Sequence, residues 1–345
     1  MDNLISIVIP TKNEENNIVT LLDKIKESVK NNYEILVVDD SDNMMTMAKA
    51  SWNGAEIIVG QRRGLGQAII DGINASNGDV IVVMDADLSH NPVYITPMVE
   101  ACRNGYGMAV GSRYCKGGEI NGWSFRRKVI SKVASLLAYP LTLISDNTSG
   151  FFAVNSRLFN EVTLQANSWK IMLEVLIKTK AKIVEVPIRF SDRQYGKSKF
   201  TSKQMREYIK HLAKLYFYKY RFLSFGFVGG IGLITNLIIL YLLTDIVGIN
   251  YLMSFIVAFL VAASQNYLMN KKWTFGDIKE SKLGYFRYLG ITSVTLILDE
   301  ILLWAFTDGI GMWYGVSALL AVLVAFIIRY TLVGKLIWKN KNVAY

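Results

Sequence analysis

The sequence predicts two unlike halves: an α/β domain built on a parallel sheet, followed by an all-α membrane domain of four helices. The chain is 52% hydrophobic and only 19% charged over 345 residues, which is more apolar than an ordinary soluble protein. The apolar excess lies in the 124 residues from Phe222 to the end, which hold only 9 of the 38 Lys+Arg and 6 of the 28 Asp+Glu. Before Phe222, strand-like and helix-like segments alternate, as they do in βαβ units.

The alternation in the first half can be followed segment by segment. We expect strands at 5–9, 34–38, 56–59 and 80–84, with helices from Glu14, near Met44 and from Leu65. Polar residues follow three of these strands, as Pro10-Thr11, Asp39-Asp40 and Asp85-Ala86-Asp87. Ligands of open parallel sheets bind at the carboxyl ends of the strands, so the site is expected there.

Asp85 and Asp87 follow the apolar run 80–84, and the period of two along a strand puts both carboxylates on one side of its end. Such a pair can share a divalent ion with the phosphates of a substrate, so this pattern favours Mg²⁺ or Mn²⁺ and a diphosphate donor. An isolated D-x-D pattern is more often turn or cap chemistry than a metal site, and the position after a buried strand makes the two interpretations about equal. The cluster Asp39–Asp42 likewise fits either a helix N-cap or hydrogen bonds to a base or ribose.

Several classes are excluded or weakened. There is no Walker lysine motif, and the glycine loop 60–66 lacks the G-x-G-x-x-G spacing of dinucleotide-binding proteins. Arg63 and the free amides of that loop could still attract phosphate, although a solvated turn is nearly as good an interpretation. Two cysteines, Cys102 and Cys115, and two histidines, His90 and His211, are too few for a disulfide framework or a multi-histidine metal centre.

Four apolar stretches in the second half are each near the ~20 residues that cross a bilayer. They cover about 222–243, 251–269, 286–306 and 314–334. The links 244–250 and 307–313 carry no Lys or Arg, whereas the link between the second and third stretches is basic. The positive-inside rule therefore predicts a multi-pass protein of the cell membrane whose N-terminal half is cytoplasmic, and no signal-peptide pattern opens the sequence.

The membrane half repeats itself at an offset of 63 residues, which predicts two tandem helical hairpins. The matched residues include Asp245 with Asp308, Gly248 with Gly311, Ser254 with Ser317, Asn236 with Asp299, and Asn266 with Arg329. Asp299, Glu300 and Arg329 lie inside predicted spans, so we expect them to face the interior and to pair. An ion pair that fixes helix packing and a pathway for lipid or sugar both fit this pattern.

Two basic amphipathic segments precede the membrane half. Residues 125–144 begin with basic side chains and continue apolar up to and beyond Pro140, and residues 201–221 interleave Lys and Arg with Tyr, Leu and Phe. Both are predicted to be helices in the membrane interface, although a core helix with a basic outer face has the same pattern. The net charge of +10 also raises nucleic acid as a partner. We expect none, because the positive charge largely follows the cytoplasmic side of membrane elements.

The complete set of motifs resembles the second family of inverting nucleotide-sugar glycosyltransferases, and within it the dolichyl- or polyprenyl-phosphate mannose synthase type. The blocks are 9–14 (IPTKNE), 37–40 (VVDD), 63–66 (RGLG), 84–90 (MDADLSH), 111–114 (GSRY), 149–153 (SGFFA), 169–174 (WKIMLE), 184–187 (VEVP) and 192–199 (DRQYGKSK). The membrane half resembles the four-helix GtrA-type domain fused to some members. The resemblance implies a GT-A (Rossmann-like) catalytic domain over 1–200, an amphipathic helix over 201–221 and a GtrA-like domain over 222–345.

The resemblance also implies roles for individual residues. Those that match nucleotide-holding positions are Pro10, Glu14, Val37, Asp39, Asp85 and Ala86, and those that match positions reaching the donor's phosphates or sugar are Arg113, Lys170, Arg193 and Lys199. The family's metal ligands fall on Asp87 and Ser89, with Asp85 nearby. Two residues depart from the family pattern: Ser89 replaces a common Gln, and Lys12 replaces a Tyr at the donor site.

Arg113, Arg127 and Ser131 match positions that receive the acceptor phosphate, and Asp85, Asp87 and Arg113 are the expected catalytic residues. A phosphate monoester is largely ionised at neutral pH, because its second pKa is about 6, so attack on the sugar needs no strong general base. Asp146 is then an orienting residue. The resemblance implies inverting transfer of mannose from GDP-mannose to dolichyl or polyprenyl phosphate with Mg²⁺ or Mn²⁺. Transfer of glucose from UDP-glucose, and a lipid-linked sugar flippase role for the membrane domain, remain open alternatives. A processive polysaccharide synthase is disfavoured because the Gln-x-x-Arg-Trp pattern is absent.

Overall fold

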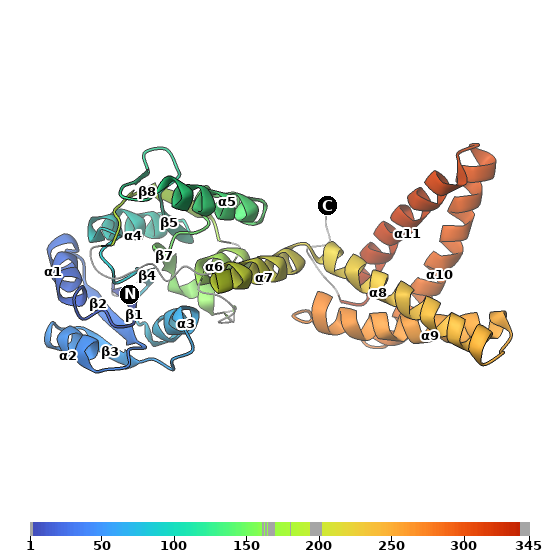
Figure 1. The fold of residues 1–345 in the computed structure, drawn as a ribbon, viewed down its shortest axis with the longest axis horizontal. Coiled ribbons are helices and arrows are strands. Elements are labelled where there is room, and N and C mark those ends of the chain that lie inside the picture. Colours follow the sequence, from blue (N-terminus) through green and yellow to red (C-terminus); the bar gives the residue numbers. More distant parts are fainter. Residues whose placement is uncertain are drawn as a thin grey trace. The chain divides into compact units, whose positions relative to one another are not determined.

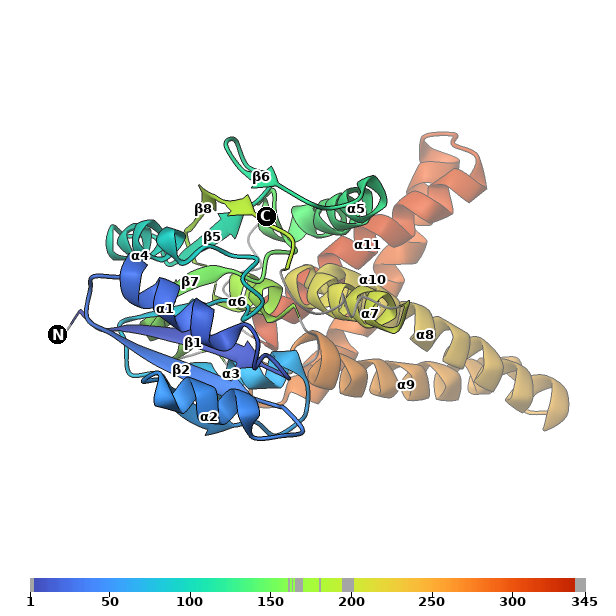
Figure 2. The same cartoon turned by 60° about the vertical axis from the view of Figure 1, so that its left-hand side comes forward.

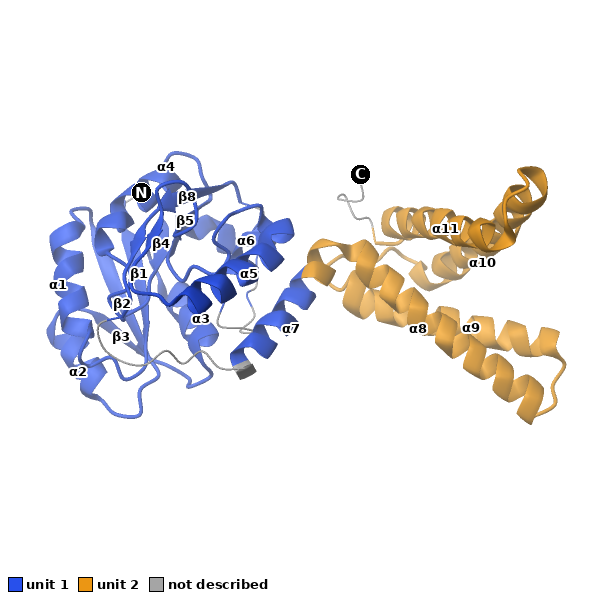
Figure 3. Cartoon of the chain, turned by 45° about the horizontal axis from the view of Figure 1, so that its top comes forward, with its two compact units in different colours: residues 1–215 blue, residues 216–345 orange. Residues whose placement is uncertain are grey.

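The computed structural model describes residues 3–160, 162, 164, 170–179, 181–193 and 202–338, without the side chains of residues 202 and 203. The chain forms two compact units, residues 1–215 and residues 216–345 (Figure 3). Each unit has its own core and is described separately below.

The first unit is built on a seven-stranded sheet in the order β3-β2-β1-β4-β7-β5-β8 (Figures 1 and 2). The strands are β1 (Ile5–Thr11), β2 (Tyr33–Asp39), β3 (Glu56–Val59), β4 (Val80–Val83), β5 (Met108–Ser112), β7 (Phe152–Asn155) and β8 (Ile183–Pro187). Strand β7 runs antiparallel to both β4 and β5, and the other neighbours are parallel. The short strands β6 (Glu119–Ile120) and β9 (Arg189–Phe190) form a separate parallel pair. The carboxyl ends of β1, β2, β4 and β5 therefore share one edge of the sheet.

Helices cover both faces of this sheet because its central strands are apolar on both sides. The helices are α1 (Ile18–Ser28), α2 (Met45–Trp52), α3 (Leu65–Ala75), α4 (Ile95–Arg103) and α6 (Ile171–Thr179), with 3₁₀ turns at Pro92–Tyr94 and Ser156–Phe159. Along β1, Ile7 and its neighbours at a spacing of two pack with α1 and α4, whereas Val8 packs with α3 and α6. The predicted α/β fold is confirmed, with helices on both faces of the sheet.

Element boundaries follow the sequence closely, with one displacement. Strand β3 and the start of α3 lie where they are predicted, but the first helix begins at Ile18 and not at Glu14. Asn13 has a φ of 57°, and the backbone N–H of Asn17 donates to the carbonyl of Glu14 at 3.0 Å. This turn occupies the first four residues of the segment and delays the helix.

The basic segment after β6 forms α5 (Phe125–Thr142). Ser124 caps its N-terminus, because the Ser124 hydroxyl accepts the backbone N–H of Arg127. The buried face of α5 is made of small side chains and Leu141, whereas large apolar side chains are exposed, namely Phe125, Val129, Val133, Leu136, Leu137 and Leu143 just past its end. The next helix, α7 (Ser202–Lys219), is tied to α5 because the Tyr208 hydroxyl donates to the carbonyl of Ala134 at 2.8 Å.

The second unit contains four helices long and apolar enough to span a membrane, Arg221–Ile246, Tyr251–Thr274, Gly284–Gly309 and Tyr314–Leu336. They comprise α8 (Arg221–Tyr241), α9 (Tyr251–Met269), α10 (Gly284–Trp304) and α11 (Tyr314–Leu336). The first three continue as π-helical turns at Leu242–Ile246, Asn270–Thr274 and Ala305–Gly309, so these spans end later than predicted. Four helices of this length make the chain a multi-pass membrane protein.

The 63-residue repeat extends to the backbone and to the core of this unit. The π-turns at 242–246 and 305–309 are equivalent, and they are followed by Gly248 and Gly311, whose φ values are 82° and 80°. Equivalent aromatic residues also meet in one cluster: Phe225 with Tyr288, Tyr267 with Tyr330, and Phe275 with Trp338. The rings of Phe275 and Trp338 stack at 4.5 Å with an angle of 10° between their planes. The repeat therefore supplies both halves of the aromatic cluster.

Of Asp299, Glu300 and Arg329, two pair with each other and the third is exposed. Arg329 on α11 donates through Nε to the hydroxyl of Thr295 at 2.7 Å, and its Nη2 lies 3.9 Å from Asp299 on α10. The predicted pairing of Asp299 with Arg329 is therefore present. The prediction for Glu300 is wrong, because Glu300 is exposed on the outer face of α10. Adjacent helix residues point about 100° apart, so Asp299 and Glu300 cannot both face α11.

Candidate active site

A cavity of about 990 Å³ opens at the carboxyl edge of the sheet in the first unit. It is lined by residues after β1 and β4, by the glycine loop before α3, and by residues of α5, α6 and α7. The cavity therefore joins the two carboxylates after β4 to the basic start of α5. The lining includes twelve of the predicted site residues: Pro10, Lys12, Glu14, Asp85, Ala86, Asp87, Ser89, Arg113, Arg127, Ser131, Lys170 and Arg193.

The loop after β4 presents its two carboxylates differently. Asp85 is 37% exposed, and a Cβ atom on Gly150 would lie 2.8 Å from Asp85 Oδ2, so glycine leaves room for this carboxylate. Asp87 accepts the backbone N–H of Ser89 at 3.1 Å and a short hydrogen bond from the Ser89 hydroxyl. Its other oxygen lies 3.4 Å from Nη2 of Arg193. Ser89 therefore donates both its backbone N–H and its hydroxyl to Asp87.

These donors suit a hard divalent ion. Oxygen atoms of two carboxylates and one hydroxyl are gathered on one loop, and a guanidinium cation already lies beside Asp87. Within the described part of the chain there is no group of three or more His, Cys, Asp or Glu side chains that could hold a metal alone. An ion bound here would therefore need further oxygen ligands from a substrate or water.

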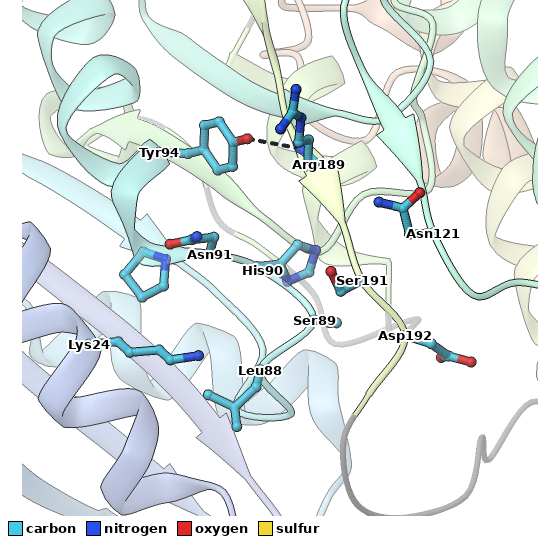
Figure 4. A pocket seen from close by; sticks show the side chains of 11 residues that line it. Lys24, Leu88, Ser89, His90, Asn91, Tyr94, Asn121, Arg189, Ser191 and Asp192 are labelled. Atoms are coloured by element: carbon cyan, nitrogen blue, oxygen red, sulfur yellow. Dashed lines mark hydrogen bonds between the residues drawn. The ribbon is translucent and has the colours of Figure 1, made fainter.

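His90 packs behind this loop. It is buried between the rings of Phe151 and Phe190, each 5.2 Å away, and its Nδ1 lies 3.9 Å from Asp85 Oδ2. Burial is the largest cause that lowers the pKa of His90, with Asp85 and Asp87 opposing it. A second hollow of about 390 Å³ adjoins the same loop, and Ser89 and His90 line both cavities (Figure 4). The Tyr94 hydroxyl braces its wall by accepting the backbone N–H of Arg189 at 3.1 Å.

At the carboxyl end of β2, Asp40 lines the cavity, whereas Asp39 does not. Asp39 is buried and accepts hydrogen bonds on Oδ1 from the hydroxyls of Thr11 and Ser41, both at 2.7 Å. Its Oδ2 is buried without a hydrogen-bond partner among the described residues. A buried carboxylate oxygen of this kind is costly unless a donor reaches it, which fits a ligand hydroxyl or amine. Val37 packs in the core of the sheet, so its side chain does not reach the cavity.

Asp40 shapes the glycine loop, a role that the sequence did not suggest. Its Oδ1 accepts the backbone N–H of Arg62 at 2.9 Å, and a Cβ atom on Gly60 would lie only 2.1 Å from that oxygen. Arg62 has a φ of 55° and Gly64 one of 94°. The loop therefore needs glycine at position 60 for close approach, and it places Arg62 and Arg63 at the cavity.

Arg113 follows β5 and is locked by a buried carboxylate. Its Nε and Nη2 each donate to Asp146 at 2.7 Å, and Nη2 also donates to the Thr148 hydroxyl at 2.8 Å. Burial alone would raise the pKa of Asp146, but the charge and hydrogen bonds of Arg113 outweigh it and lower that pKa. Asp146 thus holds the Arg113 guanidinium through two hydrogen bonds. These bonds use Nε and Nη2 and leave Nη1 out of the ion pair.

Lys170 lies just before α6 and is buried beside this pair. Its ammonium donates a short hydrogen bond to the carbonyl of Thr148. Burial lowers the pKa of Lys170 to about 7, and Arg113 acts in the same direction, whereas Asp85 and Asp146 oppose it. A lysine in this state changes charge near neutral pH, which is unusual for the residue. Lys199, the other predicted lysine, lies outside the described residues.

Arg127 and Ser131 lie one turn apart on α5, and both line the cavity. Arg127 donates through Nη1 to Asp192 at 2.9 Å, and its guanidinium lies 4.1 Å from the ring centre of Trp123. The Ser131 hydroxyl is 3.0 Å from that of Thr148. Thr148 therefore connects Arg113, Lys170 and Ser131, although no motif in the sequence marks it.

Comparison with known proteins gives the same two-part organisation. Residues 6–163 match the model of glycosyl transferase family 2, and residues 224–338 match that of the GtrA/DPMS transmembrane domain. A dolichol-phosphate mannosyltransferase from Pyrococcus furiosus is 35% identical over 97% of this chain and 99% of its own length. Those from Mycosarcoma maydis and Saccharomyces cerevisiae are each 30% identical, over 65% and 62% of this chain and 82% and 88% of their own.

Among solved structures, glucosyl-3-phosphoglycerate synthase from Mycobacterium tuberculosis, in complex with Mn²⁺, UDP and glucosyl-3-phosphoglycerate, is 21% identical with a TM-score of 0.47. The match covers 62% of this chain and 79% of that one. The relative from Pyrococcus furiosus extends over both units, whereas this structural match extends over a smaller share of the chain.

The catalytic half thus has the GT-A fold, and the membrane half follows it in the same chain as in the full-length relative. With 35% identity over nearly its whole length, this chain is a glycosyltransferase that belongs to the dolichol-phosphate mannosyltransferase family.

Proposed function

We propose that the protein transfers mannose from GDP-mannose to the phosphate of a dolichyl or polyprenyl phosphate at the cytoplasmic face of the membrane. The observation that carries this proposal is the single cavity that joins the Asp85 and Asp87 carboxylates to Arg113, Arg127 and Ser131. A diphosphate donor at one end and a phosphate acceptor at the other would meet inside it. The names of the relatives support the mannosyl transfer, and GDP-mannose is the donor we infer.

At the donor end, Asp85, Asp87 and Ser89 would hold Mg²⁺ or Mn²⁺ against the diphosphate. When bound, such an ion supplies positive charge to the departing diphosphate oxygen. Pro10, Lys12 and Glu14 would border the nucleotide, with Asp39 and the backbone around Val37 and Ala86 beneath it. Arg193, Lys170 and Lys199 would reach the phosphates or the sugar.

At the acceptor end, Arg113, Arg127 and Ser131 would bind the phosphate of the lipid. An oxygen of that phosphate forms the bond to the anomeric carbon while the bond from that carbon to the diphosphate breaks, with inversion at the carbon. The acceptor is already an anion at neutral pH because its second pKa is about 6, so no side chain has to remove a proton. Asp146 holds Arg113 and does not act as a base.

The exposed apolar face of α5 would contact the lipid chain of the acceptor. Arg127 and Ser131 face the cavity, whereas Phe125, Leu136 and Leu143 beside it are exposed. We infer that this apolar face lies in the membrane interface. The phosphate of the lipid would then enter the cavity while its hydrocarbon chain stays in the membrane. The basic link between the second and third spans favours a cytoplasmic position for the catalytic unit.

The test is transfer by the purified full chain in detergent with a short polyprenyl phosphate. Radiolabelled GDP-mannose and UDP-glucose are supplied separately, with Mg²⁺ or Mn²⁺, and labelled lipid is extracted and counted. We expect labelled lipid from GDP-mannose only, and none when the metal is chelated. If only UDP-glucose gives labelled lipid, the donor is UDP-glucose and not GDP-mannose. If neither donor gives labelled lipid, the proposed transfer is overturned.

A further inference from the structure

Trp123 contacts both arginines of the proposed acceptor site. The centre of the Arg127 guanidinium lies 4.1 Å from the Trp123 ring centre, and that of Arg113 lies 5.2 Å from it. Both distances are within the range of cation–π attraction, for which Trp offers the strongest ring. Trp123 lies in the loop between β6 and α5 and lines the large cavity, but no sequence motif points to it.

Two guanidinium groups near one ligand position repel each other when the ligand is absent. Each has a carboxylate partner, Asp146 for Arg113 and Asp192 for Arg127, but each carboxylate occupies N–H donors. An aromatic ring attracts the face of a guanidinium and leaves its in-plane N–H groups available. The ring can therefore hold two cations in place without using the donors that a phosphate needs.

The ring itself is fixed from the donor side of the cavity. Phe190 meets it edge to face at 5.1 Å, and Phe190 also packs on His90 at 5.2 Å, just after the D-x-D residues. Phe190 also lies 5.3 Å from the Arg113 guanidinium. The Trp123 ring is thus supported by the same packing that supports the proposed metal loop, so its position is set before any acceptor arrives.

We propose that Trp123 is a positioning residue for the acceptor phosphate, whose ring holds the guanidinium groups of Arg113 and Arg127 ready for a single phosphate monoester. This inference rests on the proposed function, because it takes these two arginines as the acceptor site. Its distinct consequence is that a change at Trp123 weakens binding of the lipid phosphate while leaving binding of the nucleotide sugar unchanged.

The experiment compares the full chain with Trp123→Leu, Trp123→Phe and a matched control, Trp52→Leu. Trp52 lies on α2, is 85% exposed and does not line the cavity. The KM values for polyprenyl phosphate and for GDP-mannose are measured separately in detergent. We expect Trp123→Leu to raise the KM for the lipid about ten-fold, and Trp123→Phe, which keeps an aromatic face, to raise it about three-fold or less. The KM for the donor should stay unchanged in all three variants.

A double-mutant cycle separates positioning from a general structural defect. If Trp123 acts through Arg127, the effect of Trp123→Leu on the lipid KM shrinks in an Arg127→Ala background, whereas a folding defect persists there. Equal lipid KM values for wild type and Trp123→Leu, or equal losses in both backgrounds, would overturn the inference. Absence of transfer by the wild-type chain would instead overturn the proposed function, so the two failures are distinguishable.

Discussion

Arg193 places its Nη2 3.4 Å from Oδ2 of Asp87, so a positive charge lies beside a carboxylate proposed to bind metal. The same dipeptide, Asp192-Arg193, also contacts the proposed acceptor site, because Asp192 accepts a hydrogen bond from Arg127 at 2.9 Å. Two adjacent residues of opposite charge thereby contact both the proposed metal loop and the proposed acceptor site.

The first prediction concerns Asp87. Replacing Asp87 by Ala removes the proposed anionic metal ligand, which is also the carboxylate that Arg193 and Ser89 contact, so transfer should fall about 100-fold or more. Radiolabelled transfer across a Mg²⁺ or Mn²⁺ titration measures it, with Asp23→Ala on α1 as the matched control. Turnover by Asp87→Ala that remains near normal and metal-dependent would sink the metal assignment.

The second prediction concerns the buried pair of Asp146 and Arg113. Asp146→Asn leaves a buried guanidinium without its charge partner, which should cost about 3–5 kcal/mol in the free energy of unfolding. Asp79→Asn is the matched control, because Asp79 pairs in the same two-bond manner with Arg103 but is partly exposed, where an ion pair contributes about 1 kcal/mol or less. Urea unfolding in detergent, followed by circular dichroism, measures both. Equal losses in the two variants would contradict this account.

The same pair predicts a dependence of stability on pH. Because the folded pKa of Asp146 is lowered, its contribution is present above the unfolded value of about 3.9 and is lost as pH falls through the folded value. Wild type should therefore lose more stability than Asp146→Asn on acidification over that interval. Parallel stability profiles for the two proteins would show that the carboxylate is not favoured in the folded state.

The third prediction concerns Lys170, whose pKa is lowered to about 7 by burial. Its positive charge is present below that pH and is lost above it, so kcat/KM for the donor should decline as pH rises through about 7. Lys170→Arg keeps its positive charge, so kcat/KM for the donor should no longer decline through this pH range, even if its highest value is lower than that of wild type. Lys182 lies over the ring of Tyr106 and does not line the cavity, so Lys182→Arg should retain the wild-type pH profile. Identical profiles for all three proteins would rule Lys170 out as the titrating group.

The fourth prediction separates the two units. All of the residues that line the large cavity lie between Pro10 and Tyr208, so a chain that ends at Arg221 should still transfer mannose to a detergent-solubilised acceptor. The kcat and donor KM should stay within a few-fold of those of the full chain. Loss of transfer by a truncated protein that still melts cooperatively would assign the membrane unit a part in catalysis.

Much of the first unit could be predicted because its signals are local. The strand at 56–59 and the helix from Leu65 follow from hydrophobic pattern and glycine punctuation, and the D-x-D loop follows from its place after a buried strand. The partners of the site residues could not be predicted in this way. Arg113 and Asp146 are 33 residues apart, and Arg127 and Asp192 are 65 apart, so only the folded sheet brings them together.

The membrane unit shows the same limit. The repeat predicted two hairpins, but the matched residues did not include the pair of Phe275 and Trp338. Their equivalence appears only when the rings are seen stacked. Glu300 was grouped with Asp299 because both lie in one span, whereas the turn of the helix sends them to different sides.

The stacked rings of Phe275 and Trp338 also bear on how the membrane unit assembles. Each hairpin contributes one of the two, together with one member of every other matched aromatic pair in the cluster. Neither hairpin completes this cluster alone, so the two copies of the repeat must meet before the cluster is formed. The two copies are not interchangeable, because Arg329 stands where the first copy has Asn266.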